Sequence, residues 1–308
     1  IAPCKKQNNM NVVLKENFKK DFADIWRDEL ESVGFDTSSI EDKDIPFKYF
    51  TVVLRTIEKK PRTIYKAANF ICPAELQAGL TILEDKITRG ESLFPHQSKS
   101  VNNLTSEDCL LYSWSIHHFH LGETLETGGF IKRTGPVLFA YVTDDAFYMI
   151  DIKQHGAWSD KGLLQTLYDN WPSLLQGWKI DGKPEVNFNS KEIGKLRKAH
   201  INAIVELNDG SSFVGPGFGI TSAGTPVEAT LKYSDIMRHI EGFIRDLRKD
   251  PTDFLSTKYN EAEIANMQDL SFDFFLDKKA PNQIIAVDRV HGIYQVLFKQ
   301  NKFLKDNK

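Results

Sequence analysis

Two apolar segments, residues 136–142 and 146–152, flank the short polar sequence Thr143-Asp144-Asp145 in the middle of the chain. Both segments are rich in β-branched and aromatic residues, which favour β-strands. A short polar turn between two such segments is typical of a β-hairpin. The pattern therefore predicts that the chain contains at least one small antiparallel sheet.

Helical periodicity appears on both sides of this hairpin. Apolar residues recur at three- and four-residue steps over residues 11–34, 73–90 and 233–249, as they do on the buried face of a helix. In the first of these helices we expect an aromatic stripe to be buried, because it is too large to leave in water. The stripe consists of Phe18, Phe22, Trp26 and Leu30.

Further strands are predicted along the whole length of the chain. The sequence Asn208-Asp209-Gly210 is a strong hairpin signal,. We therefore expect an α+β fold of small antiparallel sheets flanked by helices, in two lobes. Besides the first hairpin, the predicted strands are residues 47–57, 116–121, 201–207, 211–214, 272–276, 284–287 and 293–298.

The chain has 308 residues, which suggests two domains at roughly 150 residues each. Residues 181–189 carry Gly, Pro and Asn, and we interpret this stretch as the boundary between two lobes. The N-terminal lobe, residues 1–181, contains the residues discussed below, and the C-terminal lobe, residues 182–308, has no assigned role. A glycine-rich loop at 215–226 lacks the Gly-Lys-Ser/Thr ending of a P-loop,, and is interpreted as a flexible connection.

Composition excludes several classes of protein. Hydrophobic residues make up 41% and charged residues 26% of the chain, which excludes wholesale disorder. No apolar run approaches the ~18 residues that a membrane helix needs, and the first residues lack the pattern of a signal peptide. The three cysteines, Cys4, Cys72 and Cys109, are far apart and odd in number. We therefore expect a cytoplasmic protein without a disulfide framework.

Histidines and cations cluster in the middle of the chain. Four of the eight histidines lie between residues 117 and 155. If 116–121 is a strand, His118 and His120 point to the same face of the sheet. His155 directly follows the second hairpin strand, and Lys132 and Arg133 directly precede the first. These five side chains are therefore predicted to meet near one cleft.

Such a cluster can cleave a phosphodiester without a metal. One imidazole takes the 2′-hydroxyl proton of RNA and a second group protonates the leaving 5′-oxygen. A Lys or Arg stabilises the negative charge that develops on phosphorus. The catalytic candidates are His118, His120, Lys132, Arg133 and His155. This chemistry requires neither a metal nor another cofactor.

Two alternatives remain open at this stage. The same histidines, His118, His120 and His155, are candidate ligands of a metal-dependent hydrolase, with Asp151 or Glu123 as a further ligand. Alternatively, the histidines are structural, and the protein is a non-enzymatic nucleic-acid-binding or protein-interaction module.

A second basic segment precedes the histidine cluster. The cations Arg55, Lys59, Lys60, Arg62 and Lys66 fall within twelve residues that contain a single acidic residue. Clustered cations of this kind contact nucleic-acid phosphates, although a lone charged run is also typical of a solvated turn. Because the whole chain has a net charge of −3, any phosphate-binding surface must be local.

Residues 116–165 resemble the core of RelE/HigB-type ribonuclease toxins. The matching order is a strand, a loop with glycines, a segment with Lys and Arg, two strands around a polar turn, and a histidine followed by a helix. In this sequence the pieces are His118-Phe119-His120-Leu121-Gly122, Phe130-Ile131-Lys132-Arg133, Val137–Val142, Asp144-Asp145, Tyr148–Ile152 and His155.

The resemblance implies metal-free RNA cleavage by clustered Lys, Arg, His and Tyr side chains. Lys132 and Arg133 look like the strand cations of the family, and His155 looks like the histidine after the last strand. His118 and His120 have no counterpart there. The implied protein is a cytoplasmic endoribonuclease of toxin or phage-defence type. Its candidate partners are RNA, an antitoxin or another protein, and a second copy of the chain.

Overall fold

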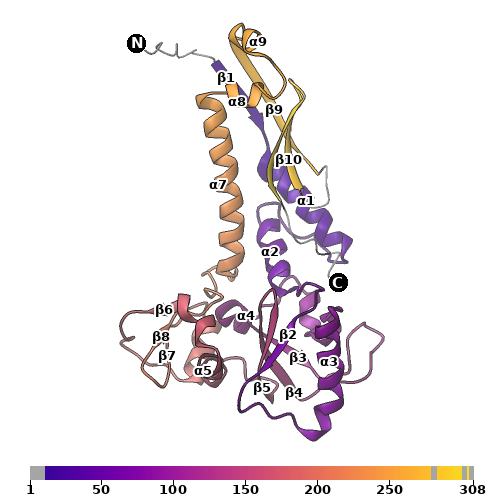
Figure 1. Cartoon of the computed structure of the whole chain (residues 1–308), viewed down its shortest axis with the longest axis vertical. Coiled ribbons are helices and arrows are strands. Elements are labelled where there is room, and N and C mark those ends of the chain that lie inside the picture. Colours follow the sequence, from indigo (N-terminus) through magenta and orange to yellow (C-terminus); the bar gives the residue numbers. More distant parts are fainter. Residues whose placement is uncertain (1–10, 279–282, 300–303, 305–308) are drawn as a thin grey trace. The chain divides into compact units, whose positions relative to one another are not determined.

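The computed structural model describes residues 11–278, 283–299 and 304 of the chain (Figure 1). These residues form two compact units. The smaller unit comprises residues 11–32, 36–46 and, after residue 231, the described residues up to 299. The larger unit comprises residues 33–35, 47–231 and 304. Both units combine helices with small sheets, so the predicted α+β class is confirmed.

The larger unit carries most of the secondary structure. Its strands are β2 (Thr63–Lys66), β3 (Ile116–His120), β4 (Pro136–Val142), β5 (Ala146–Gln154), β6 (Lys179–Ile180), β7 (Val205–Glu206) and β8 (Ser212–Phe213). Its α-helices are α2 (Ile45–Arg55), which begins in the smaller unit, α3 (Gln77–Arg89), α4 (Cys109–Trp114), α5 (Lys161–Asn170) and α6 (Ser190–Lys198). Its 3₁₀ helices are η1 (Ala74–Leu76), η2 (Phe94–His96), η3 (Lys99–Asn102), η4 (Pro172–Leu174) and η5 (Gln176–Trp178).

The main sheet of the larger unit has the order β2-β5-β4-β3. The predicted hairpin forms β4 and β5, which pair antiparallel, and β3 pairs antiparallel with β4. Strand β2 pairs parallel with β5, so the sheet is mixed. The second predicted hairpin is also present, because β7 pairs with β8 around Asn208-Asp209-Gly210.

Two hydrophobic cores cover the two faces of this sheet. On one face, Leu80 and Leu83 of α3 pack with Phe119 and Phe147. On the other face, the leucines of α5 pack with Ile116 and Phe139. Side chains alternate along a strand, so the positions of His118 and His120 share the face of Ile116. His118 and His120 therefore lie on the sheet face that α5 covers, and His117 lies on the other face. Figure 1 shows α3 and α5 on either side of the sheet.

The smaller unit is built around a sheet of order β1-β9-β10-β11. Strand β1 pairs parallel with β9, and the other neighbours are antiparallel. The aromatic stripe of α1 is buried, as predicted: Phe18 contacts Phe274 and Phe22 contacts Phe298, with ring centroids 6.2 and 5.8 Å apart. The elements are β1 (Asn11–Glu16), α1 (Phe18–Ser32), α7 (Val227–Lys249, starting in the larger unit), α8 (Thr252–Leu255), α9 (Glu261–Ala265), β9 (Asp269–Asp277), β10 (Gln283–Asp288) and β11 (Ile293–Lys299).

The units differ from the predicted division into residues 1–181 and 182–308. Residues 182–231 belong to the larger unit, because Val205 and Phe213 of the second hairpin complete the core beneath Ile116. The N-terminal residues join the C-terminal part through the pairing of β1 with β9. The polar stretch 181–189 is thus a loop within a unit rather than a boundary. Among the described residues, no helix is long and apolar enough to cross a membrane.

Two predicted elements have a different structure. Residues 47–57 were expected to form a strand, but residues 45–55 form helix α2. Ile45, Tyr49 and Val52 are buried in helical steps, so tertiary burial overrides the strand preference of this β-branched run. The predicted helix over 11–34 begins later, because residues 11–16 form β1.

The glycine-rich loop is a packed segment rather than a flexible connection. The amide of Gly217 donates to the carbonyl of Ser113, and that of Gly219 donates to the carbonyl of Tyr112, at 3.2 and 2.8 Å. A Cβ at Gly217 would lie 2.2 Å from the Tyr112 oxygen. Glycine is therefore required where the loop covers the carbonyl groups at the end of α4.

Arg55 holds together three segments of the larger unit, and its replacement should destabilise the protein. The buried guanidinium donates from Nε to the hydroxyl of Tyr112 and from Nη1 to the carbonyl of Asn103, each at 3.0 Å. It also contacts the carbonyl of Ser106. We expect Arg55→Ala to lower the free energy of unfolding by about 2–4 kcal/mol, because buried acceptors lose their donor.

Chemical denaturation followed by tryptophan fluorescence measures this effect. Lys59→Ala, at an exposed position of the same basic segment, is the control and should change the free energy by no more than about 0.5 kcal/mol. Equal stability of the two variants would contradict the structural role of Arg55.

Candidate functional site

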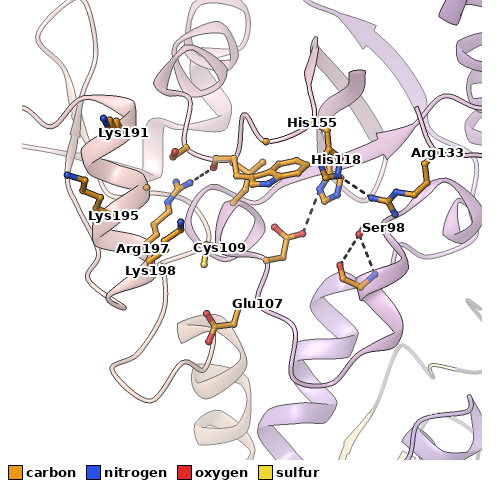
Figure 2. A pocket seen from close by; sticks show the side chains of 17 residues that line it. Ser98, Glu107, Cys109, His118, Arg133, His155, Lys191, Lys195, Arg197 and Lys198 are labelled. Atoms are coloured by element: carbon orange, nitrogen blue, oxygen red, sulfur yellow. Dashed lines mark hydrogen bonds and ion pairs between the residues drawn. The ribbon is translucent and has the colours of Figure 1, made fainter. Parts of the chain in front are cut away.

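A cavity of about 680 Å³ opens in the larger unit, on the sheet face that carries His118 (Figure 2). This volume is in the range of small-molecule and cofactor pockets, about 300–1,000 Å³. The lining comes from the η3 region, α4, β3, the segment before β4, the segment after β5, and α6. The lining side chains that carry chemistry are Glu107, Asp108, Cys109, His118, Arg133, His155, Trp158, Lys191, Lys195, Arg197 and Lys198.

Three of the five predicted catalytic residues meet at one wall of this cavity. His118 comes from β3, Arg133 from the segment before β4, and His155 from the end of β5. The guanidinium Nη2 of Arg133 lies 3.1 Å from Nε2 of His155, and the rings of His118 and His155 are 6.5 Å apart between centroids. Figure 2 shows the three side chains at the same side of the site.

Each of the two imidazoles has a charged neighbour, Arg133 beside His155 and Asp108 beside His118. A guanidinium can only donate, so Nε2 of His155 accepts the hydrogen bond from Arg133 and Nδ1 carries the proton. Nδ1 of His118 lies 3.9 Å from the carboxylate of Asp108. That carboxylate also accepts the amide of Leu111 at the start of α4, at 3.0 Å. Asp108 is therefore fixed in place beside His118 by the helix that it caps.

The pKa values of both imidazoles are lowered from the usual 6.5. For His155, whose side chain is only partly buried, this partial burial is the larger cause and the charge of Arg133 is the second. For His118, burial is again the largest cause of the lowered pKa, and Asp108 acts in the opposite direction. At neutral pH both rings are therefore mostly neutral. The charge of Asp108 makes the imidazolium form of His118 more favourable than it would be for a buried histidine with no carboxylate beside it.

His120 lies behind this wall rather than in the cavity. Its side chain is 1% exposed and stacks on His155 with ring centroids 5.8 Å apart. Burial, reinforced by Arg133, lowers the pKa of His120 to about 3. The ring therefore stays neutral near pH 7 and supports His155 by packing. The predicted direct catalytic role of His120 is not consistent with this position.

Helix α6 forms the opposite wall of the cavity (Figure 2). Lys191, Lys195 and Lys198 recur at steps of four and three, so they share one face of the helix, and all three are exposed. A capping box starts the helix at Asn189, whose side chain accepts the amides of Lys191 and Glu192. A Cβ at Gly194 would lie 2.9 Å from Oγ of Ser159. The helix is thus packed closely against the segment that carries Trp158.

Trp158 connects the two walls. Its ring lies 4.5 Å from that of His118 and 4.8 Å from that of His155, between centroids. Its backbone carbonyl accepts a hydrogen bond of 2.5 Å from Nη1 of Arg197. The Arg197 guanidinium also lies over the Trp114 ring, 3.9 Å from the centroid. The aromatic residue thus holds the histidines and the α6 cations in one site.

The cavity is strongly cationic although the chain is not. Five permanent cations and two carboxylates line it, an excess of three positive charges with neutral histidines, against a net charge of −3 for the chain. Glu107 pairs with His200 at 3.1 Å and Asp108 faces His118. In the part of the chain that the structure describes, none of the five cations forms an ion pair with a carboxylate. Such a cavity favours an anionic ligand.

Lys132 and the basic segment 55–66 lie outside this site. Lys132 is exposed and is not among the lining residues. Arg55 and Arg62 are buried, and Arg62 donates to the carbonyls of Thr143 and Glu58 at 2.9 and 2.8 Å. Both arginines therefore stabilise the fold and are not available for the predicted contact with nucleic acid.

Two lysines of the basic segment have acidic neighbours, and a third is exposed. Lys66 pairs with Glu84 at 2.7 Å, and Lys60 lies 3.5 Å from Asp145. Lys59 is exposed. The segment is thus a turn with its own ion pairs, which is the alternative interpretation of its charge.

No metal-ligand set was found among residues 11–278, 283–299 and 304, where no three His, Cys, Asp or Glu side chains are placed to hold an ion. His118, His120 and His155 are near one another, but His120 is sealed behind the other two. The metal-dependent alternative therefore lacks a ligand set in the described residues.

Sequence reasoning missed the α6 wall and Trp158. The signal for the wall was present as the 191, 195, 198 spacing in an amphipathic segment. Nothing in that spacing indicates that the helix faces histidines more than thirty residues away in the sequence. The burial of Arg197 beside Trp158 has no sequence signal.

Comparison with known proteins identifies no relative: no family model matches the chain, and neither a curated protein nor a solved structure matches it.

The coupling between Arg133 and His155 can be measured directly. Arg133 lowers the pKa of His155, so we expect Arg133→Gln to raise that pKa toward 6.5 in an NMR titration of the histidine ring protons. Lys132→Gln removes a neighbouring charge that does not reach His155 and should leave its pKa unchanged. Identical His155 titrations in both variants would contradict the observed contact.

Proposed function

We propose that the larger unit is a metal-independent endoribonuclease whose active site is the cavity between α6 and the histidines. The observation that carries this proposal is the convergence of His118, Arg133 and His155 at one wall of a cationic cavity. Two imidazoles and a guanidinium supply the general base, the general acid and the charge stabilisation that RNA cleavage requires. The toxin or phage-defence role belongs to the same proposal and rests on the resemblance of residues 116–165 to RelE/HigB-type toxins.

The residues take distinct roles in this mechanism. His155, more exposed and next to Arg133, is the general base that takes the 2′-hydroxyl proton. The resulting oxygen attacks phosphorus and the bond to the 5′-oxygen breaks. His118, in the imidazolium form that Asp108 favours, is the general acid that gives its proton to the leaving 5′-oxygen. The products are a 2′,3′-cyclic phosphate and a free 5′-hydroxyl.

Arg133 acts on the phosphate during this step. In the free protein its Nη2 donates to Nε2 of His155. When a phosphate binds, the guanidinium donates to the phosphate oxygens instead, because a charge-assisted bond to an anion is stronger than one to a neutral ring. This exchange frees Nε2 of His155 to accept the proton. Arg133 then stabilises the negative charge that grows on the phosphorane oxygens.

A cleavage assay tests the proposal. The full chain is incubated with a mixed-sequence single-stranded RNA, and with DNA of the same sequence, in buffer containing EDTA. We expect cleavage of the RNA alone, because DNA lacks the 2′-hydroxyl. Binding of both strands without cleavage would instead favour a nucleic-acid-binding module with structural histidines. Cleavage that appears only on addition of a divalent ion would favour a metal-dependent hydrolase.

A further inference from the structure

The lysine face of α6 lies across the cavity from the proposed scissile phosphate. Figure 2 shows Lys191, Lys195 and Lys198 at the side of the site opposite to Arg133 and His155. These lysines therefore line the cavity at a position that the proposed chemistry does not use. Their role is a separate question from the identity of the acid and the base.

The three lysines of α6 form a row along one face of the helix. Lys191 and Lys198 are seven residues apart on one helix, which corresponds to about 10 Å at ~1.5 Å per residue. A row of this length is suited to successive phosphates of a strand rather than to one tetrahedral anion. The cavity volume of about 680 Å³ leaves room for more than a single phosphate group.

Arg197 provides a second, independent indication of an anion at this wall. The side chain is buried, with 5% of its surface exposed. Its Nη1 donates to the Trp158 carbonyl, whereas Nη2 has no hydrogen-bond partner in the described part of the structure. Burial lowers its pKa to about 10, so it remains charged at neutral pH. The charge of Asp108 acts on Arg197 without forming an ion pair with it. A buried charge that lacks an ion pair is unfavourable, and an anion bound in the cavity would stabilise it.

We infer that the α6 wall, defined as Lys191, Lys195, Arg197 and Lys198, binds the phosphate backbone of a single strand beyond the scissile phosphate. The substrate class is thus an RNA strand rather than a mononucleotide or a cyclic nucleotide. This inference rests on the proposed function for the position of the scissile phosphate. It makes the α6 lysines binding residues that contribute to affinity and not to the chemical step.

Binding of a strand that cannot be cleaved separates the two proposals. The probe is a fully 2′-O-methylated single-stranded RNA, and its dissociation constant is measured by fluorescence anisotropy over a range of salt concentrations. The test variant carries Lys191→Ala, Lys195→Ala and Lys198→Ala together. The control carries Lys15→Ala, Lys19→Ala and Lys249→Ala, which remove the same charge from exposed positions of the smaller unit.

The salt dependence gives the expected result. Each phosphate contact on a single strand adds about 0.7 to the slope of log K against log salt. We expect the α6 variant to lose about 2 from that slope, and the control variant to lose nothing. Binding of adenosine 3′-monophosphate, which occupies only the Arg133 end, should be equal in all three proteins. With RNA that can be cleaved, the α6 variant should show a raised KM and an unchanged kcat.

The outcomes distinguish the inference from the proposed function. A salt slope equal to that of the wild type in the α6 variant would overturn the inference, even if the protein cleaves RNA. A reduced slope in a protein that cleaves nothing would support the α6 wall as a strand-binding surface and overturn the ribonuclease proposal. If the α6 variant lost mononucleotide binding and strand binding equally, the inference would also be overturned. The mononucleotide and the strand would then bind through the same phosphate site.

Discussion

Replacement of His155 by alanine should lower the rate of RNA cleavage at saturating substrate by about 10²–10⁴-fold, the usual contribution of one general acid or base. The expected loss is in kcat, because the ring takes part in proton transfer, whereas phosphate binding is carried by cations. The measurement is steady-state cleavage of a fluorescently labelled RNA. The side chain is exposed, so the variant should unfold at the same denaturant concentration as the wild type.

His239→Ala is the matched control for this change. His239 is an exposed histidine of α7 in the smaller unit, where Nδ1 contacts the carbonyl of Asp235 at 2.8 Å. Its removal should leave kcat and KM unchanged. Full activity of His155→Ala would show that His155 is not the general base. It would favour the alternative in which the histidines have a structural role.

Replacement of Arg133 by alanine should lower kcat by about 10²–10³-fold, the effect of removing one donor that acts on the transition state. The guanidinium lies beside His155, and in the proposed mechanism its charge matters most when negative charge develops on phosphorus. We expect KM to change less than kcat, because the other cations of the cavity still attract the strand. Arg133→Lys should recover part of the rate, because the positive charge is kept. The recovery should be incomplete, because an ammonium group lacks the planar pair of donors of a guanidinium.

Arg248→Ala, at an exposed cation near the end of α7, is the control for the change in net charge. It should behave as the wild type in both kcat and KM. If Arg133→Ala raised KM alone, Arg133 would be a binding residue and the charge stabilisation would have to come from another group.

Local features of the fold were predictable from the sequence, and distant pairings were not. The hairpin of β4 and β5 was predicted because its two strands and its turn lie within twenty residues. The pairing of β1 with β9 joins residues 11–16 to residues 269–274, and no local pattern specifies such a partner. The division into units depends on that pairing, so the boundary predicted near residue 182 was misplaced.

The site was predictable to a similar extent. Strand alternation places His118 and His120 on one face, and the end of β5 brings His155 to the same place. Alternation does not say how deep each ring lies, so the burial of His120 could not be inferred. In α2 the β-branched run was compatible with a strand or a buried helix, and only the packing of Ile45 and Tyr49 decides between them. Because residues 45–55 form this helix, Arg55 at its end is buried. Arg55 therefore does not belong to a surface that could contact nucleic acid.

The central claim is that this cavity cleaves RNA through the 2′-hydroxyl with side chains alone. The most direct measurement is mass spectrometry of the products from a DNA strand that contains a single ribonucleotide, incubated with the full chain in EDTA. The account predicts one cut, after the ribonucleotide, leaving a 2′,3′-cyclic phosphate on one product and a 5′-hydroxyl on the other. Cleavage at deoxyribonucleotides, products with a 5′-phosphate, or an intact strand under conditions where it binds would contradict it.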